Sequence, residues 1–387
     1  MRILLGGIPL GCDNIGDEAI LACVVKMLRT AIPDVELTVA TADPSTARLL
    51  NVEVVPAFGF AGCNLDGFDD TVRRHDAYVW CGATGLSDYP HVALDLLEIA
   101  QKAGVPTFIW GVGMDDELNP VFFKVYGKCR MLLKLCGLVG WYERRLRARL
   151  ARRIATVLPR CSGVWLRDPE SAAMLASFGY PSAGVAADTA ILFAPPSPPS
   201  PTNNPLSSIL YPLSSKPHVP TLGLCISTQR QVADLDGVKR LIAAVRATGA
   251  HVLGIPMNPK TDRSLLERLE VACIPGTTPE AVAEAAAHCD VVLSSRLHLL
   301  ILAANVGTPI MGIARGSKLA NWLANFGRTV EGSVFDCDWE RVTGHVLAAL
   351  KDRGDWDAVR AAAYARLTVR FAAARDEFIA KLAGLPS

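Results

Sequence analysis

Short, continuous apolar runs alternate along the chain with longer segments in which apolar residues recur every three or four positions. In the first half, the runs that predict strands are 2–8, 35–39, 77–80 and 107–112. Apolar residues at helical spacing predict helices at 17–31 and 92–103. Strands that are apolar throughout and separated by helices are typical of a parallel sheet with both faces covered.

The second half repeats this alternation after a proline-rich interruption. Its predicted strands are 221–226, 251–255, 291–294 and 309–313, and its predicted helices lie near 235–248, 262–270, 279–288 and 297–306. Five of the seven residues at 195–201 are proline, which joins neither a helix nor a central strand.

The sequence therefore predicts an α/β protein with two Rossmann-like domains. We expect the domains at 1–194 and 217–354, with a proline-rich linker at 195–216. A helix at 355–387 ends the chain, and our hypothesis is that it packs back on the first domain. Parallel sheets bind ligands at the carboxyl ends of their strands, so we expect the site in a cleft between the domains.

Composition narrows the class of protein. The 387 residues are half apolar and carry a net charge of +1, which argues against disorder and against a nucleic-acid-binding protein with a basic surface. No apolar run approaches the ~20 residues of a membrane span, and the first residues do not resemble a signal peptide. Eleven cysteines without a Cys-x-x-Cys pair predict a reduced cytoplasmic protein without disulfides or a metal site.

Two glycine-rich loops follow predicted strands of the first half. The loop at 6–18 holds Asn14, Gly16 and Asp17 just before a helix, whose free N–H groups favour an anion. The structural alternative is that Asp17 caps the helix and Asn14 stabilises the turn. The second loop holds Gly82 and Thr84 and suits an anion or the hydroxyls of a sugar acceptor.

Asp88 follows that second loop, where we expect a helix to begin. It is a candidate general base. The equal alternative is an acidic residue that stabilises the first turn of the helix through its dipole.

Three cationic groups also follow predicted strands. Arg167 precedes a proline-started helix and suits a phosphate or carboxylate, with a salt bridge to a neighbouring acid as the structural alternative. Ser295, Arg296 and His298 lead into a very apolar helix, where His298 is a candidate proton donor or a satisfied core histidine. Lys318 follows the next strand and is a candidate phosphate ligand or a solvated surface charge.

Several of these motifs resemble the polysaccharide pyruvyl transferases. The resemblance rests on NIGDEAIL at 14–21, Arg167 with Asp168 and Ser171, ADT at 187–189, SRLHLLI at 295–301, and GTP at 307–309 followed by Lys318. The motifs occur in the family's order over about 1–330, and the one at 295–301 is the most specific.

The resemblance implies a fold similar to the double-Rossmann (GT-B) glycosyltransferases. It also implies transfer of pyruvate from phosphoenolpyruvate to two sugar hydroxyls in a cell-surface polysaccharide or its precursor, which forms a cyclic ketal without a metal or other cofactor. Carried over by position, His298 is the general acid, Arg296 anchors the donor and Arg167 is a second anion ligand. Asp88 becomes the base of this scheme.

Two other functions remain open from the sequence. One is a glycosyltransferase of the same fold with a nucleotide-sugar donor, and the other is a non-catalytic sugar- or nucleotide-binding protein. Six arginines crowd into 144–153 beside apolar residues and a Trp-Tyr pair, which suggests peripheral contact with a membrane and a lipid-linked or polymeric acceptor. The alternative for 144–153 is a solvated helix face with its apolar positions packed inward.

Overall fold

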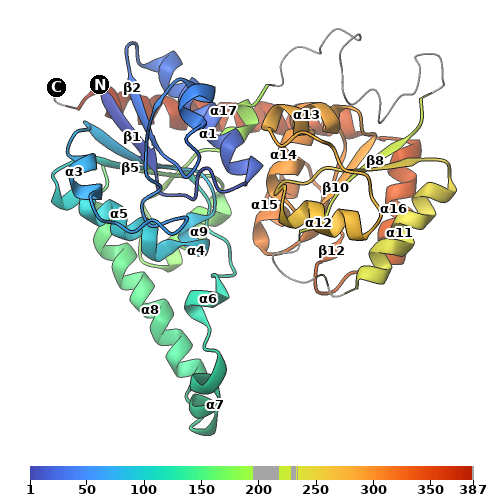
Figure 1. Ribbon diagram of the computed structural model, residues 1–387, viewed down its shortest axis with the longest axis horizontal. Helices are drawn as coiled ribbons and strands as arrows, with labels where there is room; N and C mark the ends of the chain where they lie inside the picture. The colour runs from blue at the N-terminus through green and yellow to red at the C-terminus, as the bar shows by residue number, and fades with distance from the viewer. Residues whose placement is uncertain (195–217, 228–231, 233, 386–387) are drawn as a thin grey trace. The chain divides into compact units, whose positions relative to one another are not determined.

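The computed structural model describes residues 1–194, 218–227, 232 and 234–385, so the predicted linker at 195–216 lies outside the described residues. Contacts divide the chain into two units (Figure 1). Unit 1 comprises Met1–Cys12, Ile20–Thr189 and Leu367–Ser387, and unit 2 comprises Asp13–Ala19 and Ala190–Arg366. The first helix and the last helix are therefore each divided between the two units.

Unit 1 is built on a parallel sheet that has seven strands among the described residues, in the order β3-β2-β1-β4-β5-β6-β7. The strands are β1 (Arg2–Gly6), β2 (Glu36–Ala40), β3 (Glu53–Val55), β4 (Ala77–Cys81), β5 (Thr107–Val112), β6 (Gly163–Leu166) and β7 (Gly184–Val185). Every residue of β4 and β5 is buried. Because successive side chains of a strand point to opposite faces, both faces of this sheet are covered.

The helices of unit 1 connect these strands. They are α1 (Ile15–Ala31), α2 (Thr46–Leu50), α3 (Phe68–Val72), α4 (Gly85–Asp88), α5 (Pro90–Lys102), α6 (Pro120–Phe123), α7 (Gly127–Leu135), α8 (Val139–Val157) and α9 (Pro169–Ser177), with a 3₁₀ turn at Leu158–Arg160. A second 3₁₀ turn, Thr189–Leu192, begins at the last residue of this part of unit 1 and continues into unit 2. Helix α8 buries Leu150, Ile154 and Val157 and packs against α5. In Figure 1, α8 extends away from the sheet of unit 1 and α7 lies at its far end.

The last helix, α17 (Trp356–Ala383), completes the core of unit 1 with its second half. The ring of Phe378 stacks on Trp110 at 4.7 Å between centroids, and Phe371 meets the same tryptophan edge-on at 5.5 Å. Trp165 Nε1 donates a hydrogen bond to Glu377 at 3.2 Å. These large buried rings hold the C-terminal helix on the sheet, since aromatic pairs add stability beyond the area that they bury.

Unit 2 has a parallel sheet of five strands within its described part, in the order β12-β11-β10-β8-β9. The strands are β8 (Thr221–Cys225), β9 (His251–Gly254), β10 (Val291–Ser294), β11 (Ile310–Ala314) and β12 (Gly332–Ser333). The helices are α11 (Leu235–Ala247), α12 (Thr261–Arg268), α13 (Pro279–Ala287), α14 (Leu297–Asn305), α15 (Ser317–Ala324), α16 (Trp339–Lys351) and the first half of α17. Seven of the nine residues of α14 are buried, which explains why it lacks a polar face.

The predicted α/β class with two parallel-sheet domains is confirmed. Most of the strands and helices predicted from the apolar pattern lie within two residues of their observed bounds. Within the residues that the structure describes, no helix combines the length and apolarity needed to cross a bilayer.

Candidate active site

In unit 2, the loops that follow β8, β10 and β11 lie at one edge of the sheet. These strands are parallel neighbours, and Ser294 at the end of β10 pairs in register with Cys225 at the end of β8. Their carboxyl ends therefore bring together the segments that hold Arg296, His298 and Lys318. Ligands bind at this edge in parallel α/β sheets.

Arg296 is held by a buried carboxylate. Its Nε and Nη2 donate to Asp262 Oδ2 and Oδ1 at 2.9 and 2.8 Å, and the Asp262 side chain is fully buried. Asp262 also accepts a hydrogen bond from the backbone N–H of Asn258 at 3.0 Å. Burial opposes the charged guanidinium, but the Asp262 carboxylate and the more distant Asp17 outweigh it, so the pKa of Arg296 is raised. Arg296 is thus a fixed charge, and its Nη1 takes no part in the bidentate pair.

His298 lies directly against the glycine loop at the start of α1. A Cβ atom added at Gly16 would lie 2.1 Å from Nδ1 of His298, so the ring occupies the space that a side chain would need. The loop is shaped by Asn14, whose Oδ1 accepts from the Gly16 N–H at 3.3 Å and whose Nδ2 donates to Asp17 Oδ2 at 2.6 Å. Two motifs that are far apart in the sequence therefore meet at His298.

Ser295 and Lys318 occupy different environments at this edge. The Ser295 hydroxyl accepts a hydrogen bond from the Ser227 N–H at 2.8 Å, and Arg315 Nη1 donates to Ser227 Oγ at 3.3 Å. Ser295 thus ties the β10 loop to the β8 loop. Lys318 lies half-buried in the first turn of α15, one residue inside the helix rather than in the loop itself.

In unit 1, Arg167 is buried between carboxylates. Its Nε lies 3.1 Å from Asp168 Oδ2 and its Nη1 lies 3.7 Å from Asp188 Oδ2. A Cβ atom at Gly113 would lie only 2.5 Å from Nη2, so this glycine makes room for the guanidinium. Burial disfavours the charge, but Asp168 and Asp188 outweigh it and raise the pKa of Arg167. The salt bridge to Asp168, one of the alternatives considered from the sequence, is present.

The loop after β4 has a strained backbone and positions Asp88. Gly82 has φ +80°, where a Cβ would lie 2.5 Å from Ile20, and Ala83 also has a left-handed φ of 59°. A left-handed non-glycine residue is uncommon and often marks a functional loop. Thr84 Oγ1 donates to Asp88 Oδ2 at 2.5 Å. Asp88 ends the short helix α4 instead of opening the long helix that we expected there, because the chain turns again before α5.

The sequence did not identify Asp262 or the pairing role of Asp188. An acidic residue in the first turn of a predicted helix is ordinarily a surface group, so nothing in the pattern singled out Asp262. Asp188 lies in the ADT motif at 187–189, for which the sequence predicted no role. A cavity of about 700 Å³ lies elsewhere, against α8, and it is lined by none of the predicted site residues.

Comparison with known protein families finds one family that covers most of the chain. The model described as polysaccharide pyruvyl transferase matches residues 14–317. The matched range includes the glycine loop, the Arg167 segment and the segment with Arg296 and His298. A search of curated protein sequences gave no match.

Solved structures with the same architecture are distant in sequence. Alr3699/HepE from Anabaena, in complex with UDP and glucose, has a TM-score of 0.60 at 14% identity, with 99% of each chain covered. The spinosyn rhamnosyltransferase SpnG, complexed with thymidine diphosphate, has a TM-score of 0.53 at 16% identity, with 96% of each chain covered. UDP-GlcNAc 2-epimerase from Neisseria meningitidis, bound to UDP-GlcNAc, has a TM-score of 0.53 at 11% identity, with 93% of this chain and 94% of that chain covered. At such identities the likeness concerns the fold alone, and it confirms the GT-B-like architecture.

Proposed function

The chain belongs to the polysaccharide pyruvyl transferase family, and we propose that it transfers a pyruvyl group from phosphoenolpyruvate to two hydroxyls of a sugar, forming a cyclic ketal. We propose as acceptor a cell-surface polysaccharide or its precursor. The observation that carries the proposal is the contact between His298 and Gly16 beside the fixed charge of Arg296, because it unites two family motifs around one proton-carrying side chain.

The reaction needs one acid and one base. Protonation of the methylene carbon of phosphoenolpyruvate by His298 makes C2 electrophilic and oxocarbenium-like. A sugar hydroxyl adds to C2 and gives its proton to the base. The C2–O bond to phosphate then breaks as inorganic phosphate leaves, and a second hydroxyl adds to C2 and loses its proton, which closes the ketal. The products are the ketal and inorganic phosphate. We assign the base to Asp88, whose carboxylate is oriented by Thr84.

Anion binding is proposed for Arg296 and Lys318. Arg296 offers Nη1 while Asp262 holds the Nε–Nη2 edge of the guanidinium, and the first N–H groups of α14 follow Arg296 directly in the chain. Arg167 is a different case, since an incoming anion has to compete with Asp168 and Asp188. Its role as a second anion ligand stays a prediction. No step of this scheme calls for a metal or other cofactor.

The test is phosphate release from phosphoenolpyruvate in the presence of candidate sugar acceptors. Loss of a general acid costs roughly 10²–10⁴-fold, so His298→Ala should lower kcat by about that factor. His251→Ala is the matched control, because His251 is exposed at the start of β9. If the protein releases a nucleoside diphosphate from a nucleotide sugar and releases no phosphate from phosphoenolpyruvate, the glycosyltransferase alternative replaces the proposal. Unchanged turnover in His298→Ala would show that His298 is not the general acid.

A further inference from the structure

A helical hairpin of unit 1 exposes large apolar side chains to solvent. The hairpin is formed by α7 and α8, and α7 lies at the end of α8 farthest from the sheet (Figure 1). We call the exposed apolar residues of this end the hairpin tip: Tyr126, Met131, Leu132, Leu135, Leu138 and Trp141. Leu135 is 80% exposed, and Met131 and Leu132 are 66% and 65% exposed. Clusters of exposed apolar side chains mark interaction surfaces.

The same hairpin is strongly basic. Between Lys124 and Arg153 the sequence holds ten Lys and Arg residues and one acidic residue, Glu143, whereas the whole chain carries a net charge of only +1. The excess of positive charge is therefore concentrated on the α7–α8 hairpin of unit 1, and the remainder of the chain is net negative.

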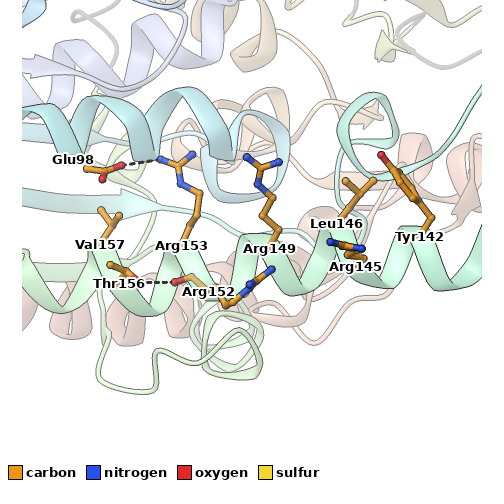
Figure 2. Close-up of a pocket in the computed structure, with 9 residues that line it drawn as sticks. All are labelled: Glu98, Tyr142, Arg145, Leu146, Arg149, Arg152, Arg153, Thr156 and Val157. Atoms are coloured by element: carbon orange, nitrogen blue, oxygen red, sulfur yellow. Dashed lines mark hydrogen bonds and ion pairs between the residues drawn. The ribbon is translucent and has the colours of Figure 1, made fainter.

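Four of these arginines line the cavity of about 700 Å³ on α8: Arg145, Arg149, Arg152 and Arg153 (Figure 2). Arg153, at one end of the cavity, is neutralised by Asp95 and Glu98. Arg145, Arg149 and Arg152 form no ion pair with any residue in the described part of the chain. The cavity is thus an open, cationic recess next to the hairpin tip.

Charge and apolarity together identify the partner. A second copy of this chain would bring one basic hairpin against another in a symmetric dimer, which like-charge repulsion opposes. A nucleic acid would meet the arginines but leave the apolar tip uncovered. An anionic bilayer satisfies both features, because apolar side chains enter the interface while arginines bind phosphate headgroups.

We propose that the hairpin tip docks on the surface of an anionic lipid bilayer and that the recess lined by Arg145, Arg149 and Arg152 takes lipid phosphate. The contact is peripheral: the tip enters the headgroup region, and α8 carries it out from the sheet of unit 1. This docking surface is separate from the proposed catalytic residues and does not depend on the reaction that they perform.

The experiment is co-sedimentation of the full chain with vesicles of phosphatidylglycerol mixed with phosphatidylcholine, and with vesicles of phosphatidylcholine alone. We expect binding to the first kind only, and a steep decrease with added salt. Each basic residue near an anionic surface contributes roughly fivefold, so Arg145→Gln/Arg149→Gln/Arg152→Gln should weaken binding on the order of 100-fold. The matched control is Arg48→Gln/Arg160→Gln/Arg268→Gln, which removes the same charge from exposed positions elsewhere.

The apolar part is tested separately. Leu132→Gln/Leu135→Gln should also weaken vesicle binding, whereas Leu49→Gln/Val369→Gln should not, although those two side chains are 70% and 72% exposed. All of the substituted side chains are exposed or line an open recess, so thermal unfolding should be unchanged, and a loss of binding then reports the surface. Equal binding by the tip and control variants would overturn the proposal. So would a light-scattering mass showing a dimer that dissociates when the tip is substituted, because a second copy would then cover it.

Discussion

Replacing Gly16 with alanine tests the contact on which the proposed active site depends. Gly16 lies in the first turn of α1, where its φ is not one that requires glycine. By helix propensity alone, Gly→Ala stabilises a helix by up to ~1 kcal/mol. The new Cβ atom, however, would lie 2.1 Å from Nδ1 and 2.7 Å from Cβ of His298. Rotation of the ring cannot relieve the second contact, so the start of α14 or the loop at 14–16 has to move.

The size of this displacement sets the expected loss of activity. Ordinary contact begins at 3.4 Å, so Nδ1 has to retreat from 2.1 Å to 3.4 Å, which is 1.3 Å. A misplacement of about 1 Å in a catalytic group can cost ~10²-fold in rate, equivalent to about 2.7 kcal/mol of transition-state free energy. We therefore expect kcat of Gly16→Ala to fall by roughly 100-fold, with a much smaller change in the thermal unfolding temperature.

Gly344→Ala is the matched control. Gly344 lies within α16, and a Cβ atom added there meets nothing within 4 Å. This variant should be more stable than the parent by about 0.5–1 kcal/mol and fully active. The activity assay measures phosphate release from phosphoenolpyruvate with a sugar acceptor. Thermal unfolding of the same variants is measured in parallel by circular dichroism. Wild-type turnover in Gly16→Ala would refute the reasoning, because it would mean that His298 need not be where the structure holds it.

Three further predictions concern stability. Asp262→Asn removes the charge that compensates the largely buried Arg296, so the free energy of unfolding measured in urea should fall by about 3 kcal/mol. An unchanged midpoint of the urea unfolding curve would show that this ion pair contributes little to stability. Gly113→Ala places a Cβ 2.5 Å from Nη2 of Arg167 and should cost about 1–3 kcal/mol by overpacking, measured in the same way. Burial, with Arg2 and Arg74 nearby, lowers the pKa of His75 below its usual 6.5. Below that pH the unfolded chain therefore binds more protons than the folded chain, and the unfolding temperature should fall as the pH drops from 7 toward 5. The fall should be less steep in His75→Gln.

The fold was predictable because its signals are local. After Thr107, the strand 107–112 contains only apolar residues and one glycine, it lies between Pro106 and Gly113, and the structure places β5 at those residues. The helix expected at 17–31 begins two residues earlier at Ile15, because Gly16 and Asp17 interrupt the apolar spacing that continues from Ile20. By contrast, Met131, Leu132 and Leu135 look in the sequence like the inward face of a helix, yet they are exposed. Periodicity identifies an apolar face but not whether another element covers it.

The site was predictable only in part, because its electrostatics depend on partners that are distant in the sequence. The family motifs pointed to Arg296 and His298, but not to the carboxylate of Asp262, which comes from a different helix and is fully buried. No local pattern distinguishes such a carboxylate from a surface acid at a helix start. The role of Asp262 as the partner of Arg296 becomes evident only when β8, β10 and α12 are placed together in the fold.

The arginines of this protein divide into two kinds, and the division determines how each would bind an anion. Arg167 is buried, Arg296 is largely buried, and both are neutralised by carboxylates, so they project little long-range field and would act on an anion only at hydrogen-bonding distance. Their carboxylate partners keep them charged and oriented before any ligand arrives, which lowers the ordering cost of binding. Arg145, Arg149 and Arg152 are exposed, and no described residue pairs with them, so they attract an anionic surface from a distance that salt shortens. The two proposals are thus compatible with a net charge near zero: the paired arginines would hold a small anion, and the unpaired ones would attract a charged surface.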